Sequence, residues 1–309
     1  MTRAAQHDRS SPAPAASRAL LSGLLRTLRP EQWVKNFFVF AALLFGQRLG
    51  DPTAVARTVG AFIAFCALSG TVYLINDLRD LERDRRHPVK RLRPLAAGDL
   101  SPLAAWMAAV VLGSGALLGA RWLPREFLWF AAAYLVLNLV YSFGLKNIVI
   151  LDVLAIAGGF VLRAVAGAAA IPVQFSQWLV LCTFLLALFL GFGKRRHELT
   201  LLADDAAEHR VSLQEYSIVF LDQMITVVLA ATVVAYSFYT MSTEVAARLH
   251  TTALPLTIPF VLYGIFRYLY LIHHRRGGGS PAHALLHDGA LLVDVALWAV
   301  SVGVILSLR

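Results

Sequence analysis

The chain has 309 residues, of which 58% are hydrophobic and only 15% are charged, and its formal net charge is +9. A soluble domain would carry about 25% charged residues, whereas the apolar residues here come in runs of about 20, the length that crosses a bilayer. Composition therefore excludes a soluble globular enzyme and predicts an all-α protein that crosses a membrane several times. The positive charge does not indicate nucleic-acid binding, because the cations gather at one predicted membrane face.

Residues 1–18 are rich in Ala, Ser and Pro and lack the apolar core of a signal peptide. We predict a disordered cytoplasmic tail over 1–25 and one catalytic membrane domain over 26–309, which Arg29–Asn36 enters as an amphipathic segment. The stretch 126–170 is divided at Leu145–Asn147, because so long an apolar run cannot form one span. Nine membrane-spanning helices are then predicted, at 36–50, 54–78, 102–121, 126–145, 148–170, 176–193, 223–243, 253–272 and 288–308.

The distribution of Lys and Arg predicts the orientation. With nine alternating helices, 20 of these residues fall on the side of the N-terminus and six on the other side. The positive-inside rule places the richer side in the cytoplasm, so we expect a multi-pass protein of the plasma (inner) membrane. The two longest connections, 79–101 and 194–222, lie on that side. Because long loops are often binding elements or lids, we expect the functional site to face the cytoplasm.

The clearest chemical signal lies at the end of the second predicted helix, where an asparagine and three aspartates precede a basic run. If the helix continues at about 100° per residue, these four residues share an arc of roughly 100°: Asn76, Asp77, Asp80 and Asp84. Oxygen ligands of this kind suit Mg²⁺, which bridges carboxylates and substrate phosphates. The sequence therefore predicts a metal–diphosphate site, with a solvated, salt-bridged surface helix as the alternative.

A second group of polar residues begins at Tyr141 and Lys146 and continues with Asp152 in the fifth predicted helix. Arg163 follows eleven residues later, on nearly the same face and about 16 Å deeper. An arginine inside a membrane normally faces a polar cavity or a partner. We predict a polar cavity lined by Asp152 and Arg163 and capped by Lys146. The alternative is a structural Asp–Arg network inside the bundle.

A nine-helix bundle with an NDxxDxxxD motif at the inner end of its second helix resembles the UbiA superfamily of intramembrane prenyltransferases. In that superfamily two Asp-rich motifs hold Mg²⁺ and the diphosphate of a prenyl donor. The first motif matches residues 76–84, but the second acidic triad is replaced by Tyr141, Lys146 and Asp152. That pattern is similar to the decaprenyl-phosphate 5-phosphoribosyltransferase branch. The segments RPEQWVKN, HPVKRLRPLAAG, GFVLRAVAG and GKRRHEL extend the resemblance over residues 25–309.

The resemblance implies transfer of 5-phosphoribose from 5-phosphoribosyl 1-diphosphate to a polyprenyl (decaprenyl) phosphate in the membrane, for synthesis of cell-wall arabinan. It implies Mg²⁺ on Asp77, Asp80 and Asp84, with Asn76 in support. Asp152 would contact a second metal or a ribose hydroxyl, and Tyr141 would orient the donor. Phosphate contacts are expected from Lys35, Lys90, Arg93 and Lys146, with Arg163 and the cluster Lys194, Arg195 and Arg196 as competing seats for the lipid phosphate.

Two other functions remain as alternatives. An ordinary member of the superfamily would move a prenyl group from its diphosphate to an aromatic acceptor, although the missing acidic triad speaks against it. A transporter would use Asp152 and Arg163 along an ion path, but the repeated halves typical of many transporters are not evident in the sequence. The sequence leaves open whether the chain forms a homo-oligomer.

Overall fold

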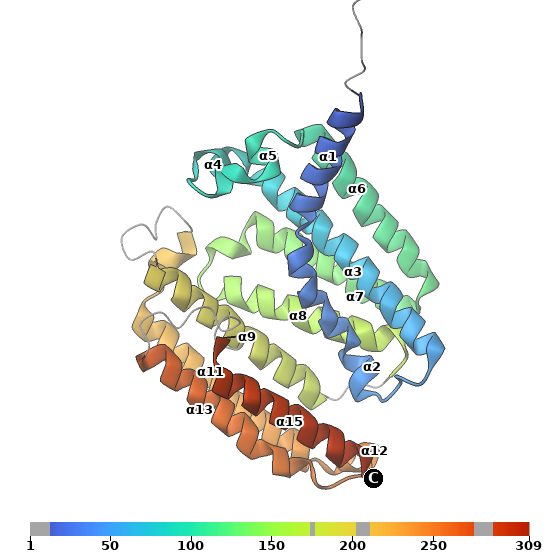
Figure 1. The fold of residues 1–309 in the computed structure, drawn as a ribbon, viewed down its shortest axis with the longest axis vertical. Coiled ribbons are helices and arrows are strands. Elements are labelled where there is room, and N and C mark those ends of the chain that lie inside the picture. The colour runs from blue at the N-terminus through green and yellow to red at the C-terminus, as the bar shows by residue number, and fades with distance from the viewer. Residues whose placement is uncertain (1–12, 174–176, 202–210, 275–286, 309) are drawn as a thin grey trace, which may run out of the picture.

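The computed structural model describes residues 13–173, 177–201, 211–274 and 287–308. Within these ranges the chain forms helices and turns and no strand, which confirms the predicted all-α class (Figure 1). Eight helices within the described ranges are long and apolar enough to cross a membrane. They are α3 (Pro52–Arg79), α6 (Pro102–Gly119), α7 (Arg125–Phe143), α8 (Leu151–Ala170), α9 (Gln177–Leu201), α11 (Ile218–Met241), α13 (Ile258–His274) and α15 (Gly289–Ser307).

These eight helices coincide with eight of the nine predicted spans. The predicted division of the apolar stretch 126–170 is also confirmed, because the short 3₁₀ turn η4 (Leu145–Asn147) separates α7 from α8. Later in the chain, α12 (Thr243–Leu249) and η6 (Leu254–Thr257) connect α11 to α13. The agreement follows from the bilayer, which requires long apolar segments whose backbone groups bond internally.

The count of nine is not confirmed, because the predicted span 36–50 is not one long α-helix. The chain there forms the 3₁₀ helix η1 (Pro30–Phe40) and the short α2 (Ala41–Phe45). Eleven residues of 3₁₀ helix advance about 22 Å, so this segment reaches far through the bundle with few residues. It packs closely on α8, since a Cβ at Gly167 would lie 2.0 Å from the carbonyl oxygen of Val39.

The N-terminal part that the structure describes is helical, since α1 spans Ala13–Leu28. The remainder of the predicted tail, residues 1–12, lies outside the described residues. The end of α1 is fastened to α3, because a Cβ at Gly70 would lie 2.7 Å from Leu28 Cδ2. This contact fixes where η1 begins.

Two segments differ from their predicted secondary structure. The helix carrying the aspartates ends at Arg79 and resumes as α4 (Leu81–Arg86), followed by η2 (Lys90–Leu92) and α5 (Pro94–Ala97). The predicted loop 194–222 begins as helix, since α9 continues to Leu201. Ion pairs between neighbouring turns support that extension, with Lys194 Nζ lying 3.8 Å from a Glu198 oxygen.

Helix α8 lies at the centre of the bundle (Figure 1). Its buried side chains belong to two apolar clusters, one shared with α9, α11 and α13 and the other with η1, α2, α3 and α7. The chain is therefore arranged as two groups of helices on either side of α8. The polar residues predicted to be functional lie where these two groups meet, at one end of the bundle.

Candidate active site

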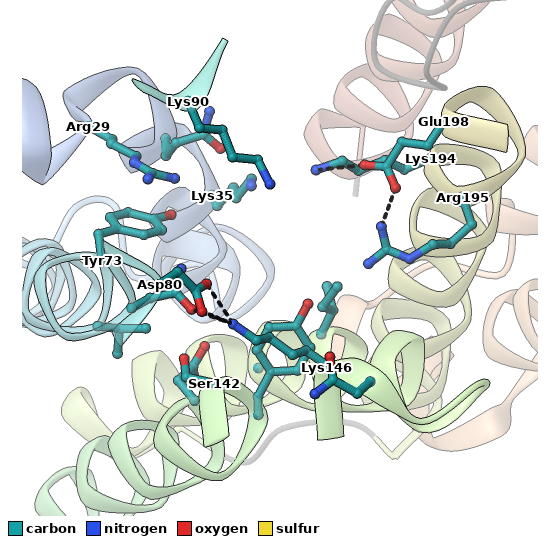
Figure 2. A pocket seen from close by; sticks show the side chains of 18 of the residues that line it. Arg29, Lys35, Tyr73, Asp80, Lys90, Ser142, Lys146, Lys194, Arg195 and Glu198 are labelled. Atoms are coloured by element: carbon teal, nitrogen blue, oxygen red, sulfur yellow. Dashed lines mark hydrogen bonds and ion pairs between the residues drawn. The ribbon is translucent and has the colours of Figure 1, made fainter. Parts of the chain in front are cut away.

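A cavity of about 510 Å³ opens between the ends of α3, α7 and α9, the first half of α8 and the segment after α3 (Figure 2). Its lining is strongly basic. Three acidic side chains of the described residues take part, namely Asp80, Asp84 and Glu198. The basic ones number nine: Arg29, Lys35, Arg83, Lys90, Arg93, Lys146, Arg163, Lys194 and Arg195. Such an excess of cations in a partly desolvated space favours polyanionic ligands.

One wall of the cavity joins the two predicted motifs directly. Lys146 Nζ donates to both carboxylate oxygens of Asp80, at 3.0 and 2.7 Å, and to Asn76 Oδ1 at 3.3 Å (Figure 2). Arg93 Nη1 lies 2.6 Å from Asp84 Oδ2. The η4 turn brings Lys146 to this position. In the structure without ligand, each of the two cavity-lining aspartates is therefore held by a basic side chain.

Asp77 is the exception among the predicted metal ligands, because it does not line the cavity. Its side chain is only 2% exposed and pairs with Arg29 at 2.7 Å and Arg93 at 3.1 Å. Asp77 still lies on the same side as Asp84, because Arg93 Nη1 contacts both carboxylates, but Arg29 and Arg93 cover it. Asp77 consequently orients two cavity-lining arginines from behind.

Asp152 also lies away from the cavity. The carboxylate is fully buried and accepts hydrogen bonds from Arg195 Nε at 2.8 Å and from the Tyr216 hydroxyl at 2.7 Å. The predicted cavity lined jointly by Asp152 and Arg163 therefore differs from the structure, where only Arg163 faces it. Sharing a helix face does not place two residues in one cavity, because different helices pack on the two ends of α8.

The segment after α9 is fastened to α8 through Tyr216. Its hydroxyl accepts a hydrogen bond from the backbone N–H of Ile150 at 2.7 Å while donating to Asp152. Ile150 has φ 68°, a conformation that a β-branched residue rarely adopts. Burial and the bond to Asp152 raise the pKa of Tyr216. This fastening holds Arg195 at the cavity, and nothing in the local sequence pattern indicated it.

Arg163 lies at the inner part of the cavity and is held entirely by neutral groups. Its Nε donates to Asn36 Oδ1 at 2.8 Å, and its terminal nitrogens donate to the carbonyl of Gly159 at 3.0 Å and to the Tyr134 hydroxyl at 2.7 Å. The guanidinium also lies 4.5 Å from the centre of the Tyr134 ring. Arg163 is 7% exposed and forms no ion pair with a described residue.

Two lysines in the lining have altered proton affinity. Burial, together with repulsion from Lys194, Arg163 and Arg29, lowers the pKa of Lys35 to about 8. Burial is also the main cause that lowers the pKa of Lys90, with Arg93 adding to it. Both effects report positive charge crowded into a space with little water.

The other predicted residues divide between the cavity and its surroundings. Tyr141 lines the cavity, as do Lys194 and Arg195. Lys194 and Arg195 lie beside Glu198, with Arg195 Nη1 at 2.5 Å from its carboxylate (Figure 2). Arg196 instead pairs with Asp222 of α11 and is absent from the lining.

Sequence reasoning missed several lining residues, some of which helical spacing could have found. Tyr73 lies one turn before Asn76 on α3, and Asn138 lies one turn before Tyr141 on α7. Residues three apart on a helix share a face, so polar residues at that spacing were a usable signal. Tyr134, one turn before Asn138, carried the same signal, whereas Arg29 carried none because it precedes η1 and reaches the cavity only through the packing of that segment.

The oxygen atoms in the cavity lining could serve as ligands of Mg²⁺. Among the described residues no three His, Cys, Asp or Glu side chains are grouped to hold a metal by themselves. Mg²⁺ sites, however, commonly use one or two carboxylates together with substrate phosphates and water. Asp80, Asp84 and the amide oxygen of Asn76 provide that set at one wall. The residues therefore fit a metal that arrives with a phosphate ligand.

Comparisons with known proteins agree with this picture. The model of the UbiA prenyltransferase family matches residues 36–287. The chain is 35% identical to a decaprenyl-phosphate phosphoribosyltransferase from Mycolicibacterium smegmatis, over 96% of each chain. It is 34% identical to the protein of the same name from Corynebacterium glutamicum, over 90% of this chain and 85% of that one. Among solved structures, a UbiA homologue from Archaeoglobus fulgidus bound to GPP and Mg²⁺ superposes with a TM-score of 0.70 at 20% identity, covering 92% of this chain and 99% of that one.

Proposed function

The chain belongs to the UbiA prenyltransferase family, and we propose that it transfers 5-phosphoribose from 5-phosphoribosyl 1-diphosphate to a polyprenyl phosphate, releasing diphosphate. The two relatives named decaprenyl-phosphate phosphoribosyltransferase match this chain over 96% and 85% of their own lengths. The product of the named branch would serve cell-wall arabinan synthesis, which we propose as the pathway.

The observation that carries the proposal is the excess of basic over acidic side chains in the cavity. The proposed donor has phosphate groups at both ends of the ribose, and the acceptor brings a further phosphate. A lining with nine basic and three acidic side chains suits this pair of ligands better than a prenyl diphosphate with an aromatic acceptor, which has far less negative charge.

The arrangement of acids also favours phosphoribosyl transfer over prenyl transfer. The prenyl-transferring pattern has a second acidic motif in addition to the first. In this chain Tyr141, Lys146 and Asp152 stand in its place; Lys146 donates to Asp80, and Asp152 is buried behind Arg195. One acidic wall is therefore available for one metal–diphosphate group, and the rest of the cavity is basic.

The proposed roles follow from position. Asp80 and Asp84 would hold Mg²⁺ together with donor diphosphate oxygens, with Asn76 in support. When bound, the metal neutralises the charge that develops on the leaving diphosphate. Lys146 and Arg93, released from the two carboxylates, would bind diphosphate oxygens directly. The remaining proposed roles are phosphate binding by Lys90, donor orientation by Tyr141, and positioning of arginines by Asp77 and Asp152.

The chemical step needs no strong base, because the acceptor is already a phosphate anion. One of its oxygens forms a bond to C1 of the ribose as the C1–O bond to diphosphate breaks, and the bonding electrons leave with diphosphate. Direct displacement inverts C1 and gives a β-linked product. Positioning of the two anions, together with stabilisation of the leaving group, would supply most of the rate.

We propose that the cavity faces the cytoplasm from the plasma membrane. The basic residues counted on the N-terminal side include most of those in the cavity lining. A water-soluble donor would enter from that side, while the acceptor's hydrocarbon chain would lie along apolar helix faces in the bilayer. Figure 2 illustrates how charged side chains from both groups of helices surround this space.

The direct test incubates purified protein with Mg²⁺, decaprenyl phosphate and donor labelled in the ribose. We expect label to move into the lipid phase and diphosphate to be released in equal amount. Prenylation of an aromatic acid, without transfer of ribose, would contradict the proposal and support the prenyltransferase alternative.

Replacing either metal-binding candidate should abolish turnover in the same assay. We expect Asp80→Asn and Asp84→Asn each to lower kcat by at least about 100-fold, because charge stabilisation of the leaving group is lost. Glu126→Gln, at an exposed position in the first turn of α7, is the matched control. Retention of activity by both aspartate variants would refute the metal assignment.

A further inference from the structure

The charges in the cavity are unevenly distributed. Asp80 and Asp84 lie at the wall formed by the end of α3, α4 and η4, and Glu198 lies on α9 beside Lys194 and Arg195. The inner part around Lys35 is different. Arg29, Arg163 and Lys194 line the same cavity as Lys35, and repulsion from these three cations adds to burial in lowering its pKa.

Lys35 itself makes no hydrogen bond or ion pair with the residues that the structure describes. Figure 2 shows its amino group pointing into the open space between Arg29 and the α9 side chains. An ammonium group in a poorly hydrated position without an acceptor is unfavourable. A bound anion would remove that cost, so the position is suited to a ligand that supplies negative charge.

Arg163 is fixed in a way that leaves part of it available. Three hydrogen bonds to neutral acceptors use three of its five N–H groups, and the remaining two belong to a side chain that lines the cavity. Asn36, adjacent to Lys35, is the acceptor for Nε and is itself held through bonds to Cys66 Sγ at 3.3 Å and Ser69 Oγ at 3.2 Å. The guanidinium is thus rigidly presented before any ligand binds.

We propose that Lys35 and Arg163 form a metal-independent seat for a phosphate monoester, separate from the metal–diphosphate site at Asp80 and Asp84. The seat has no carboxylate to hold a metal, and its two cations match the two negative charges of a monoester. Two monoesters occur in the proposed reaction, the 5-phosphate of the donor and the phosphate of the lipid acceptor. The identity of the occupant thus rests on the proposed function, whereas the existence of the seat does not.

Binding in the absence of metal tests the seat. Full-length protein in detergent would be titrated with ribose 5-phosphate and, separately, with farnesyl monophosphate, both with EDTA present, using calorimetry. We expect one of the two to bind, and the one that binds identifies the source of the monoester. Lys35→Met should weaken this binding roughly tenfold or more, because a charged hydrogen-bonding partner is lost.

Companion variants separate charge recognition from damage to the fold. Arg163→Lys keeps the charge but loses the planar fork, and we expect binding between that of wild type and Lys35→Met. Arg57→Met removes an exposed cation of α3 outside the cavity lining and should bind as wild type does. Thermal unfolding of every variant would be recorded first, so that only folded protein is titrated.

The outcomes distinguish this proposal from the proposed function. If wild-type protein transfers no ribose yet binds a monoester in EDTA through Lys35, the seat stands and the function fails. If transfer occurs, Lys35→Met should raise KM for one substrate only, the one whose monoester binds. The seat would be refuted if wild-type protein bound neither monoester in EDTA. It would also be refuted if Lys35→Met bound the monoester as tightly as wild type does.

Discussion

Individual side chains set the electrostatic character of this cavity. Lys35 is the most informative, because its ammonium group lies among other cations and its pKa is lowered to about 8. A lysine on the surface would remain fully charged under all physiological conditions. In this cavity modest alkalinity is enough to remove the charge, so the proposed binding of phosphate by Lys35 would depend on pH.

Substrate affinity should accordingly fall in mildly alkaline solution. A bound phosphate raises the pKa of Lys35 above about 8, so the contribution of this residue to binding is complete below pH 8 and is lost as the pH rises through the pKa of the complex. We expect KM for the monoester-bearing substrate to increase above about pH 8, by at most about tenfold per pH unit. Steady-state kinetics between about pH 7 and 9.5 would measure this.

Lys35→Arg provides the comparison, since a guanidinium stays charged over the whole range. The alkaline rise in KM should disappear in this variant. An identical rise in both proteins would assign the titration to another group and contradict the role given to Lys35. The monoester itself is a dianion throughout, since its second pKa is about 6.

At the scale of elements, two consecutive arginines show how α9 is held. Arg195 reaches Asp152 of α8 and is 2% exposed, whereas Arg196 reaches Asp222 of α11 and is more accessible to solvent. The first pair also supports the cavity, because Arg195 lines it and Asp152 is tied to Tyr216. The two pairs have the same chemistry at different depths and can be compared directly.

Breaking the buried pair should be more damaging than breaking the other. Asp152→Asn removes the carboxylate that accepts from Arg195 Nε and from the Tyr216 hydroxyl and leaves Arg195 only Glu198 as a carboxylate partner, which should cost about 1.5–3 kcal/mol. Asp222→Asn should cost about 1 kcal/mol or less, because water can replace its partner. Thermal unfolding in detergent would rank the two variants. Equal losses would show that Asp152 has no special structural role.

The 3₁₀ helix η1 forms part of the inner end of the cavity. It brings Lys35 and Asn36 against α8, where Asn36 meets Arg163 across 127 positions of sequence. The close approach of Val39 to Gly167 leaves no room for a side chain at that glycine. The inner part of the cavity thus depends on two backbones that lie nearly in contact.

For the whole molecule, the central feature is a cavity between two helix groups that both pack on α8 (Figure 1). Its charged groups lie at the end of the bundle where α3 ends and α6 begins. A water-soluble donor and a lipid acceptor can meet only if that end faces the aqueous side supplying the donor. Orientation is therefore a testable part of the mechanism.

Labelling with a membrane-impermeant maleimide would test the orientation. With Cys66 and Cys182 replaced by Ala, Trp122→Cys should react in intact cells because Trp122 is 92% exposed at the end opposite the cavity. Arg91→Cys, exposed on the cavity side, should react only in inverted vesicles. The reverse pattern would place the cavity outside the cell and contradict the proposed entry of the donor.

The sequence by itself determined the class of the fold, the positions of eight long helices and the division between α7 and α8. These features follow from the length and apolarity that a bilayer demands, which can be read along the chain. The spacing of Asn76, Asp80 and Asp84 and the replacement pattern around Lys146 likewise indicated the family. Each of these signals is local.

Only the tertiary structure decided which of the polar residues face one another. Asp77 is buried behind Arg29 and Arg93, and Asp152 is buried behind Arg195, so neither lines the cavity. The path of η1 places Lys35 in the same cavity as Arg163. These outcomes depend on contacts between residues far apart in the chain, and helical periodicity carries no information about such contacts because it describes one helix at a time.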